Sequence, residues 1–412
     1  GLFQNWRWVM VWITQLVFYG LPWLDWGQRQ AVLFDLGARR FYIFNLVLYP
    51  QDFIYLTGIL VISALSLFLF TAVAGRLWCG YACPQTVYTE IFLWIEKKFE
   101  GDRSARMRRD AGSMTFDKFA RKGGKHLAWL AVAFWTGFTF VGYFTPIHEL
   151  GRELIALHMS SWEVFWTIFY GFATYGNAGF MREQVCKHMC PYARFQSAMF
   201  DRDTLIVTYD ETRGEPRGPR SRKADPLQLN LGACVDCTLC VQVCPTGIDI
   251  RDGLQYECIA CGACVDACDN VMDRLGYPRG LVRYATMNTL EHKTPHVVRP
   301  RIVIYGLILL ALIGSFTYAV FNRTPLIVVV LRDRNALYRE LGDGAIENAY
   351  TFKIVNKDIV AHRYSVRILD GGDGLTLSAN AADVKVEAEG VANVAITVQS
   401  AAGAVKGQRE VV

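Results

Sequence analysis

The chain has 412 residues, of which 52% are hydrophobic and 20% are charged, and its formal net charge is +5 at pH 7. This length allows two or three domains. A high apolar fraction together with an ordinary charged fraction predicts membrane and aqueous parts in one chain. Nucleic-acid binding requires concentrated basic charge with base-reading or stacking elements, which the sequence lacks, so no nucleic-acid partner is expected. Because the chain begins with Gly rather than Met, we expect an N-terminal piece to be missing or trimmed.

Five segments have the length and apolar content of a membrane-spanning helix, which needs about 20 mostly apolar residues. They are 6–24, 53–74, 126–145, 162–181 and 301–321. The fourth segment gives the weakest signal, because it contains Asn177 and several glycines. A buried core helix is the alternative for each segment. It is least favoured for the second and fifth, whose apolar runs hold no charge.

The distribution of Lys and Arg orients these helices, because basic loops stay in the cytoplasm. The loop 75–125 is rich in Lys and Arg, whereas the loop 146–161 has only Arg152 as a strong base. Residues 75–125 and 182–300 are therefore predicted to be cytoplasmic, and 146–161 and 322–412 to lie outside. All 12 cysteines then fall on the cytoplasmic side, where thiols stay reduced. They are expected to be metal ligands or redox groups rather than disulfides.

Two of the apolar segments lead into the same short pattern, CxxxCP, as "CGYACP" and "CKHMCP". Its cysteines are Cys79, Cys83, Cys186 and Cys190. Cysteines four residues apart share a face on a helix, and Pro84 or Pro191 would kink or end that helix. If the copies adjoin, four thiols converge on a further cluster, a single soft metal ion or a copper ion in transit, since thiolates favour Cu(I). Arg76 and Arg182 could offset thiolate charge. Reduced cysteines without a ligand are the alternative.

The most specific pattern is C-x2-C-x2-C-x3-C, which occurs as "CVDCTLCVQVC" at 234–244 and as "CIACGACVDAC" at 258–268. A pair of such patterns is typical of two-cluster bacterial ferredoxins. There, three thiolates of one loop and the fourth of the other hold each [4Fe–4S] cluster. The first cluster is therefore assigned to Cys234, Cys237, Cys240 and Cys268. The second cluster is assigned to Cys258, Cys261, Cys264 and Cys244. Zinc, the alternative metal, takes four ligands with a different spacing.

These signals divide the chain into five parts. They are a membrane domain with four helices and both CxxxCP copies (1–200), a basic linker (201–230), the dicluster ferredoxin domain (231–285), a return segment with the fifth helix (286–321), and an external domain (322–412). The last part alternates apolar and polar residues over about seven short strands, which predicts an immunoglobulin-like sandwich. The expected fold is an α-helical membrane protein with about five transmembrane helices, a cytoplasmic ferredoxin-like 2[4Fe–4S] module and a C-terminal Ig-like β-sandwich.

The motifs together resemble those of one known family. Segments such as "AGRLWCGYACPQTVYTEIFLWIE", "REQVCKHMCPYARFQSAMFD" and "CPTGIDIRDGLQYECIACGACVDAC" are similar to the cytochrome c oxidase accessory proteins of bacteria, the CcoG (FixG/RdxA) family. The resemblance runs over essentially the whole chain. It implies a membrane cupric reductase that converts Cu(II) to Cu(I) during assembly of cbb3-type cytochrome c oxidase. It also implies clusters on the eight ferredoxin cysteines and a catalytic metal site on Cys79, Cys83, Cys186 and Cys190.

The resemblance further implies a multi-pass protein of the bacterial inner membrane, with the ferredoxin module in the cytoplasm and the Ig-like domain in the periplasm. The expected partners are a copper ion, a copper carrier or transporter, cbb3-type oxidase assembly factors, membrane lipid and an unidentified electron donor. A homodimer is also allowed. Two other functions stay open. One is a quinol-linked electron-transfer subunit of the nitrate or nitrous-oxide respiration type, and the other is a non-enzymatic assembly scaffold.

Overall fold

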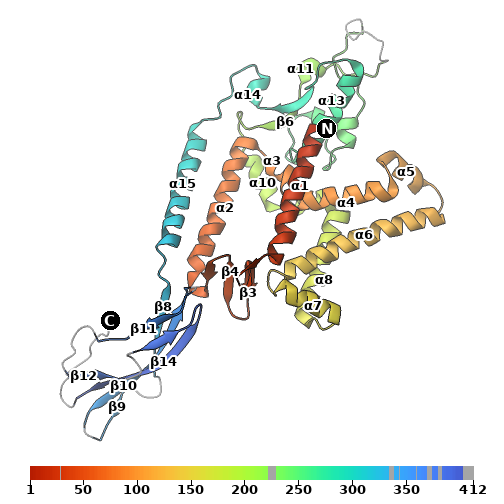
Figure 1. Ribbon diagram of the computed structural model, residues 1–412. Helices are drawn as coiled ribbons and strands as arrows, with labels where there is room; N and C mark the ends of the chain where they lie inside the picture. The colour runs from red at the N-terminus through yellow and green to blue at the C-terminus, as the bar shows by residue number, and fades with distance from the viewer. Residues whose placement is uncertain are drawn as a thin grey trace. The chain divides into compact units, whose positions relative to one another are not determined.

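The computed structural model of the chain describes residues 1–27, 29–220, 229–333, 338–342, 344–358, 360–368, 374–378 and 383–401 (Figure 1). The chain divides into two compact units. The first comprises Gly1–Ile43 and Leu48–Ser315, and the second comprises Phe44–Val47 and Phe316–Val412. Each unit has its own apolar core.

Five helices overlap the predicted apolar segments. They are α1 (Leu2–Gly20), α2 (Phe53–Ala74), α6 (Phe116–Val141), α8 (Ser161–Gly176) and α15 (Pro300–Phe321). The other helices of this region are α3 (Leu77–Tyr81), α4 (Pro84–Glu100), α5 (Arg103–Ala111), α7 (Ile147–Ala156), α9 (Arg182–Gln184), α10 (Pro191–Ala198) and α14 (Met287–Leu290). Short elements lie between α1 and α2: η1 (Leu21–Trp23), β1 (Asp25–Trp26), β2 (Arg29–Gln30), β3 (Val32–Asp35), β4 (Arg40–Ile43), β5 (Leu46–Leu48) and η2 (Pro50–Asp52).

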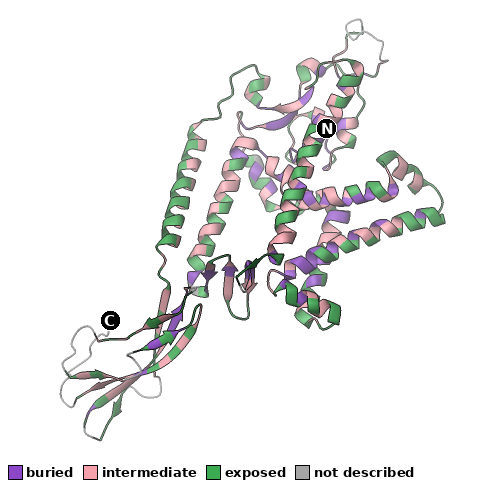
Figure 2. Cartoon of the chain, in the orientation of Figure 1, coloured by how far each residue is buried: buried purple, intermediate pink, exposed green. Residues whose placement is uncertain are grey.

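Among the described residues, α2 and α15 are the helices long and apolar enough to cross a membrane, each with 22 residues. Their apolar stretches are not buried inside protein, and Figure 2 shows α15 without a buried position. Helix α6 begins at Phe116, so its first turns carry charged residues of the loop predicted to be cytoplasmic. Helix α8 gives way to a π-helical turn, η3 (Asn177–Met181). The spans at 6–24, 126–145 and 162–181 stay predictions.

Helices α4, α6 and α8 pack through aromatic and small side chains. The rings of Phe92 on α4 and Trp129 on α6 stack with centroids 5.0 Å apart. A Cβ atom at Gly137 on α6 would lie 2.2 Å from the carbonyl oxygen of Thr167 on α8. The two helices therefore cross in backbone contact, which glycine allows. This packing fixes α4, the helix that directly follows the first CxxxCP copy.

The ferredoxin-like module is built on an antiparallel pair of strands, β6 (Ile206–Tyr209) and β7 (Val282–Ala285). Between them lie α11 (Glu211–Gly214), α12 (Leu239–Gln242), η5 (Ile250–Asp252) and α13 (Ala263–Leu275). Met272 and Leu281 belong to its core. The stretch 201–230, expected as a basic linker, contains the buried strand β6, so the module begins inside that stretch. Residues 221–228 of the expected linker lie outside the described residues.

The second unit carries the expected sandwich. Its strands in the described residues are β8 (Leu326–Arg332), β9 (Arg339–Glu340), β10 (Ile346–Asn356), β11 (His362–Tyr364), β12 (Leu375–Leu377), β13 (Val384–Val386) and β14 (Val391–Ser400). One sheet has the order β12-β14-β10-β8, with β9 beside β10, and a second sheet pairs β11 with β13. Ile354, Val384 and Val386 form the buried centre of this unit. Two antiparallel sheets around an apolar centre are the arrangement expected of an Ig-like domain.

Candidate iron–sulfur and thiol centre

Both ferredoxin cysteine loops are curled by left-handed residues at the same positions. In "CVDCTLC" these residues are Asp236 and Thr238, with φ of 50° and 57°. In "CIACGAC" they are Ala260 and Gly262, with φ of 52° and 70°. Left-handed residues within a turn aim successive backbone N–H groups inward, which makes an anion-binding concavity. The two loops are therefore structural repeats, each shaped to surround a negatively charged group.

Each loop faces a small cavity, and the fourth cysteine of each cavity comes from the other loop. One cavity is lined by Cys234, Cys237, Cys240 and Cys268. The other is lined by Cys258, Cys261, Cys264 and Cys244. Cys240 also lines this second cavity, so the two adjoin. The structure thus brings the eight cysteines together in the same two groups of four, and their role as iron ligands stays a prediction.

A buried thiolate needs a positively charged partner, which the iron ions of a cluster supply, while the cluster and its four thiolates together stay negatively charged. Burial raises the pKa of the Cys258 and Cys268 thiols to about 12, so without a metal both are protonated at neutral pH. Backbone N–H groups of Ala260 and Val282 donate to these sulfurs and oppose the rise in the thiol pKa. Iron ions supply the positive charge that buried thiolates need. The two sets of four thiols and the backbone donors therefore fit two [4Fe–4S] clusters.

The sequence did not predict a buried cation that lies beside the first cavity. The side chain of Arg251 is 8% exposed and lines the cavity of the Cys234 group. Its Nη2 lies 2.6 Å from Asp249 Oδ2, and its Nη1 lies 2.5 Å from Asp236 Oδ1. The guanidinium holds the pKa of Asp249 below its usual range and opposes the burial that raises the pKa of the Cys240 thiol. In sequence, an arginine near two aspartates is common at surfaces and gives no signal of this role.

The CxxxCP copies do not form continuous helices, which corrects the expectation that each cysteine pair shares a helix face. Cys79 lies in the short helix α3, but Cys83 is extended, with φ −62° and ψ 129°. Cys186 lies in a π-helical turn, η4 (Val185–Met189), and Cys190 is extended, with φ −81° and ψ 109°. The proline of each copy is the first residue of the next helix, α4 or α10. No intrahelical bond needs the proline N–H at that position.

The four CxxxCP thiols lie together even so. Burial raises the pKa of Cys186 to about 11, and the nearby thiols of Cys83, Cys79 and Cys190 add to the rise. The thiol of Cys190 likewise raises the pKa of Cys79 and of Cys83, and burial is the main cause of both increases. Within the described residues, no three His, Cys, Asp or Glu side chains are grouped as a single metal ion requires. The mutual charge effects on these pKa values indicate that the four thiols lie near one another.

A buried polar network holds the first copy in place. Arg76 is 3% exposed, donates from Nε to Gln196 Oε1 at 2.8 Å and donates from Nη1 to the carbonyl oxygen of Tyr256. Cys79 Sγ lies 3.4 Å from the same Gln196 oxygen. As expected, Arg76 counters the burial that raises the pKa of Cys79. Arg182 does not take the expected role, because it pairs with a glutamate of α4.

The first CxxxCP copy packs directly against the second ferredoxin loop. Cys79, Ile259 and Cys261 belong to one buried apolar cluster. A Cβ atom at Gly80 would lie 2.7 Å from the carbonyl oxygen of Ile259 and 2.8 Å from Cα of Cys261. Only glycine allows two backbones to approach this closely. Sequence reasoning did not single out Gly80 or Gln196, because no local pattern marks their long-range contacts.

Family comparisons agree with this arrangement. Residues 181–287 match a model described as a 4Fe-4S dicluster domain, and residues 56–101 match a 4Fe-4S binding domain. Residues 316–412 match the Ig-like fold at the C-terminus of FixG. A search of the solved structures finds no match. Iron–sulfur binding and an Ig-like C-terminal fold are thereby shown, and the chain is an iron–sulfur protein of the electron-transfer kind.

Similar proteins cover most of the chain. The nitrogen fixation protein FixG of Rhizobium meliloti is 39% identical over 393 residues, which are 86% of this chain and 75% of FixG. Protein RdxA of Cereibacter sphaeroides is 39% identical over 393 residues, 91% of this chain and 81% of RdxA. The ferredoxin-type protein NapH of Haemophilus influenzae is 22% identical over 230 residues, 50% of this chain and 65% of NapH. With this identity over most of both chains and the C-terminal fold of FixG, the chain belongs to the FixG/RdxA family.

Proposed function

We propose that the chain is a membrane-bound cupric reductase, which reduces Cu(II) to Cu(I) for the assembly of cbb3-type cytochrome c oxidase. The observation that carries the proposal is the contact of Gly80 with the Ile259–Cys261 backbone. Through it, electrons stored on the ferredoxin module have a short route to thiols that prefer Cu(I). The link to the oxidase comes from the resemblance of the chain to the accessory-protein family.

The ferredoxin module would hold the stored electrons. Bound [4Fe–4S] clusters supply one-electron storage, and the two proposed ligand groups are those that line the two cavities. Backbone N–H groups of Ala260 and Ala263 donate to the sulfurs of Cys258 and Cys261 and so stabilise the negative charge that reduction adds. Cys240, in the wall common to both cavities, keeps the storage sites adjacent.

The CxxxCP thiols would receive Cu(II) as the substrate. Each Cu(II) ion takes one electron and becomes Cu(I), which soft thiolates bind in preference to Cu(II). Arg76 favours the thiolate form of Cys79 and is buried with it. The Cu(I) product would then leave these thiols for a copper carrier or transporter.

A single-turnover experiment tests this function. The protein is purified without oxygen, reduced with dithionite, freed of the reductant and mixed with Cu(II) and a Cu(I)-specific chelator. We expect the cluster absorbance to return to its oxidised form while one Cu(I) is trapped for each electron stored. Clusters that stay reduced, or that bleach without forming Cu(I), would contradict cupric reduction.

A third cluster at the four CxxxCP thiols is a variant of this proposal. Residues 56–101 match a 4Fe-4S binding domain, and Cys79 and Cys83 are the cysteines of that range. Iron analysis separates the variants, since two [4Fe–4S] clusters bring about eight iron atoms per chain and three bring about twelve. A count of about twelve that falls to about eight in the Cys186→Ser variant would establish the third cluster.

Electron transfer to a protein acceptor, without copper, is the second candidate function. The similarity to the ferredoxin-type protein NapH over half of the chain favours it. In that case reduced clusters should persist in the presence of Cu(II) and be oxidised by an acceptor protein. A non-enzymatic assembly scaffold predicts a different result, in which loss of the clusters abolishes folding and partner binding together and no turnover is found.

We also propose the topology that the basic loops indicate. The chain crosses the bacterial inner membrane about five times, with the ferredoxin module in the cytoplasm and the Ig-like unit in the periplasm. The two exposed apolar helices, α2 and α15, support membrane insertion. Copper carriers and oxidase assembly factors remain the proposed partners, together with membrane lipid and, as a further option, a second copy of the chain.

A further inference from the structure

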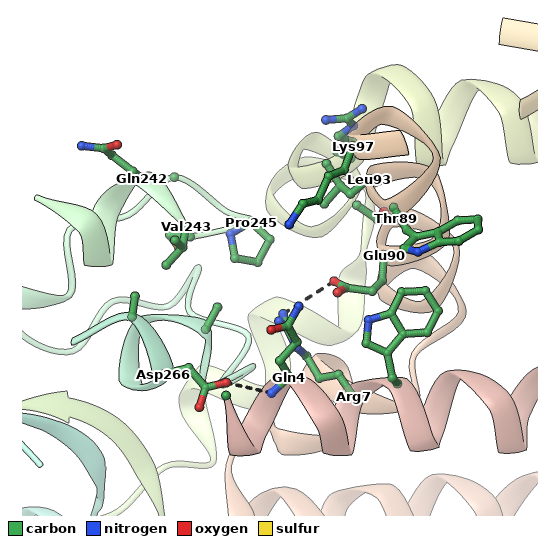
Figure 3. Close-up of a pocket in the computed structure, with 18 of the residues that line it drawn as sticks. Gln4, Arg7, Thr89, Glu90, Leu93, Lys97, Gln242, Val243, Pro245 and Asp266 are labelled. Atoms are coloured by element: carbon green, nitrogen blue, oxygen red, sulfur yellow. Dashed lines mark hydrogen bonds and ion pairs between the residues drawn. The ribbon is translucent and has the colours of Figure 1, made fainter. Parts of the chain in front are cut away.

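An open cavity of about 600 Å³, here called the polar cavity because it carries several charged side chains, lies between α1, α4 and the ferredoxin module (Figure 3). Cys244, assigned to the second cluster, is part of its wall. The opposite wall carries Gln4 and Arg7 from α1 together with Glu90 and Lys97 from α4. A molecule in this cavity would therefore touch both the cluster-side cysteine loop and several charged side chains.

Arg7 and Glu90 form a mostly buried ion pair in this cavity, as Figure 3 shows. Arg7 Nη1 lies 3.6 Å from Glu90 Oε2, and the two side chains are 11% and 18% exposed. Among the described residues, no acceptor bonds to the buried Nε of Arg7, which leaves a donor with its desolvation uncompensated. Asp266 holds the start of α1 by accepting from the backbone N–H groups of Phe3 and Gln4, at 3.3 and 2.8 Å. The cavity thus offers fixed donors and a carboxylate acceptor.

An apolar groove of about 700 Å³ adjoins this polar cavity and runs along α1, α4 and α6. Trp8 and Trp94 line both spaces, and their rings stand edge to face with centroids 6.2 Å apart. The rest of the groove is almost wholly apolar or aromatic, including Trp12, Leu16 and Trp135. Its walls on α1 and α6 belong to segments expected to cross the membrane. The paired spaces therefore match an amphiphile with a polar ring and a long apolar tail.

We propose that the two spaces bind a membrane quinol, and that this quinol is the electron donor to the ferredoxin module. The ring would occupy the polar cavity beside Cys244, and the isoprenoid tail would pass Trp8 and Trp94 into the groove. A soluble nicotinamide nucleotide has no tail to fill the groove. A phospholipid fills both spaces but cannot donate electrons. The inference rests on the proposed route of electrons through the clusters.

The reaction at this site balances with the cofactors already proposed. Oxidation of one quinol to the quinone releases two electrons and two protons, and the two clusters accept one electron each. Glu90 accepts each ring proton in turn as a carboxylate and passes it to water in the open cavity. Arg7 donates to a ring oxygen and holds the ring in place.

Photolabelling tests binding without relying on turnover. The full chain with its clusters is incubated with an arylazide derivative of a short-chain ubiquinone, irradiated and digested. We expect labels on peptides from 1–23 and 84–100, prevented by excess decylubiquinol. Arg7→Ala should weaken competition by decylubiquinol about tenfold, through loss of a charge-assisted hydrogen bond. The matched control Arg121→Ala, an exposed arginine on α6 paired with Asp117, should label like the wild type.

Reduction of the clusters by decylubiquinol tests the chemistry. Glu90→Gln keeps the size of the side chain and removes the proton acceptor, so the reduction rate should fall by about 100-fold while labelling persists. If Arg7→Ala fails to fold, the Glu90→Gln variant still tests whether the quinol reduces the clusters at this site. If the label spreads over α2 and α15 and excess decylubiquinol does not reduce it, the probe only partitions into apolar surfaces or a lipid site. That result would overturn the proposal.

The two proposals can fail separately. Clusters that dithionite reduces and Cu(II) reoxidises, but that decylubiquinol leaves oxidised, would overturn the quinol site and leave cupric reduction standing. Clusters that decylubiquinol reduces but Cu(II) does not reoxidise would support the quinol site and contradict the cupric reductase.

Discussion

Arg251 shows how one side chain sets the charge around a cluster cavity. It is buried between two carboxylates and also acts on the Cys240 thiol. A cluster with four thiolates is negatively charged, so a neighbouring guanidinium eases the addition of an electron. The two aspartates pair with the buried guanidinium, and an unpaired charge at this position would destabilise the folded protein. Arg251 is therefore expected to contribute both to stability and to the ease of cluster reduction.

Replacing Arg251 by Met removes the charge and keeps the apolar stem. We expect the free energy of unfolding in detergent to fall by about 2 kcal/mol, because the partly buried Asp249 and the exposed Asp236 lose their partner. Arg251 lowers the pKa of Asp249 in the folded protein, so the stabilisation is fully present above about pH 4 and declines as the pH falls through the lowered pKa. Denaturant titrations from pH 3 to 8 measure this.

The control for this prediction is Arg279→Met. Arg279 pairs with Asp273 at the surface, with side chains 68% and 42% exposed, so its loss should cost less than about 1 kcal/mol. Equal effects of the two substitutions, or an Arg251→Met effect that grows toward low pH, would contradict the role assigned to Arg251.

At the scale of elements, the decisive feature is the docking of α3 on the second ferredoxin loop. The cysteine spacing predicted the grouping of the ferredoxin thiols, because the repeated pattern places three thiols of each group in one short loop and the fourth in the other loop. It did not predict how the CxxxCP pairs fold, since Pro84 starts a helix instead of ending one. Nor did it predict the docking, because Arg76 and Tyr256, which help to fix it, are 180 residues apart. Such contacts leave no periodic signal in the sequence.

Gly80→Ala tests this docking. The added methyl group would overlap backbone atoms of Ile259 and Cys261, which cannot rotate aside. Overpacking of this kind costs roughly 1–3 kcal/mol and would push α3 away from the ferredoxin loop, so we expect Cu(II)-dependent reoxidation of the clusters to slow while the cluster absorbance is unchanged. Gly151→Ala on α7 is the matched control, because a Cβ there meets no atom within 4 Å. Unchanged reoxidation in Gly80→Ala would argue against this route.

Across the whole molecule, the cysteines that could hold metal are confined to one part of the chain. All 12 cysteines lie between 79 and 268, and the C-terminal unit has none. That division, together with the basic loops, predicts which parts face the reducing cytoplasm. The Ig-like fold was predictable from alternating residues, whereas three of the five expected spans rest on segments whose helices carry glycine, charge or a π-helical turn. Hydropathy alone therefore leaves those spans as predictions.

Accessibility of introduced cysteines tests the topology. Arg363 on β11 has a side chain that is 70% exposed, so Arg363→Cys should react with a membrane-impermeant maleimide in intact spheroplasts. Arg121→Cys, on the part of α6 predicted to be cytoplasmic, should react only after lysis. Reaction of Arg121→Cys before lysis would reverse the proposed orientation.

The central claim is that electrons leave the ferredoxin module through the CxxxCP thiols. Cys79 is the thiol in the buried cluster with Ile259 and Cys261, so the most direct measurement is stopped-flow reoxidation of the reduced Cys79→Ser variant by Cu(II), beside the wild type. We predict that both proteins show the same cluster absorbance before mixing, and that the variant forms Cu(I) at least about 100-fold more slowly, because serine is a poor ligand for Cu(I). Formation of Cu(I) at the wild-type rate by the variant would contradict the account.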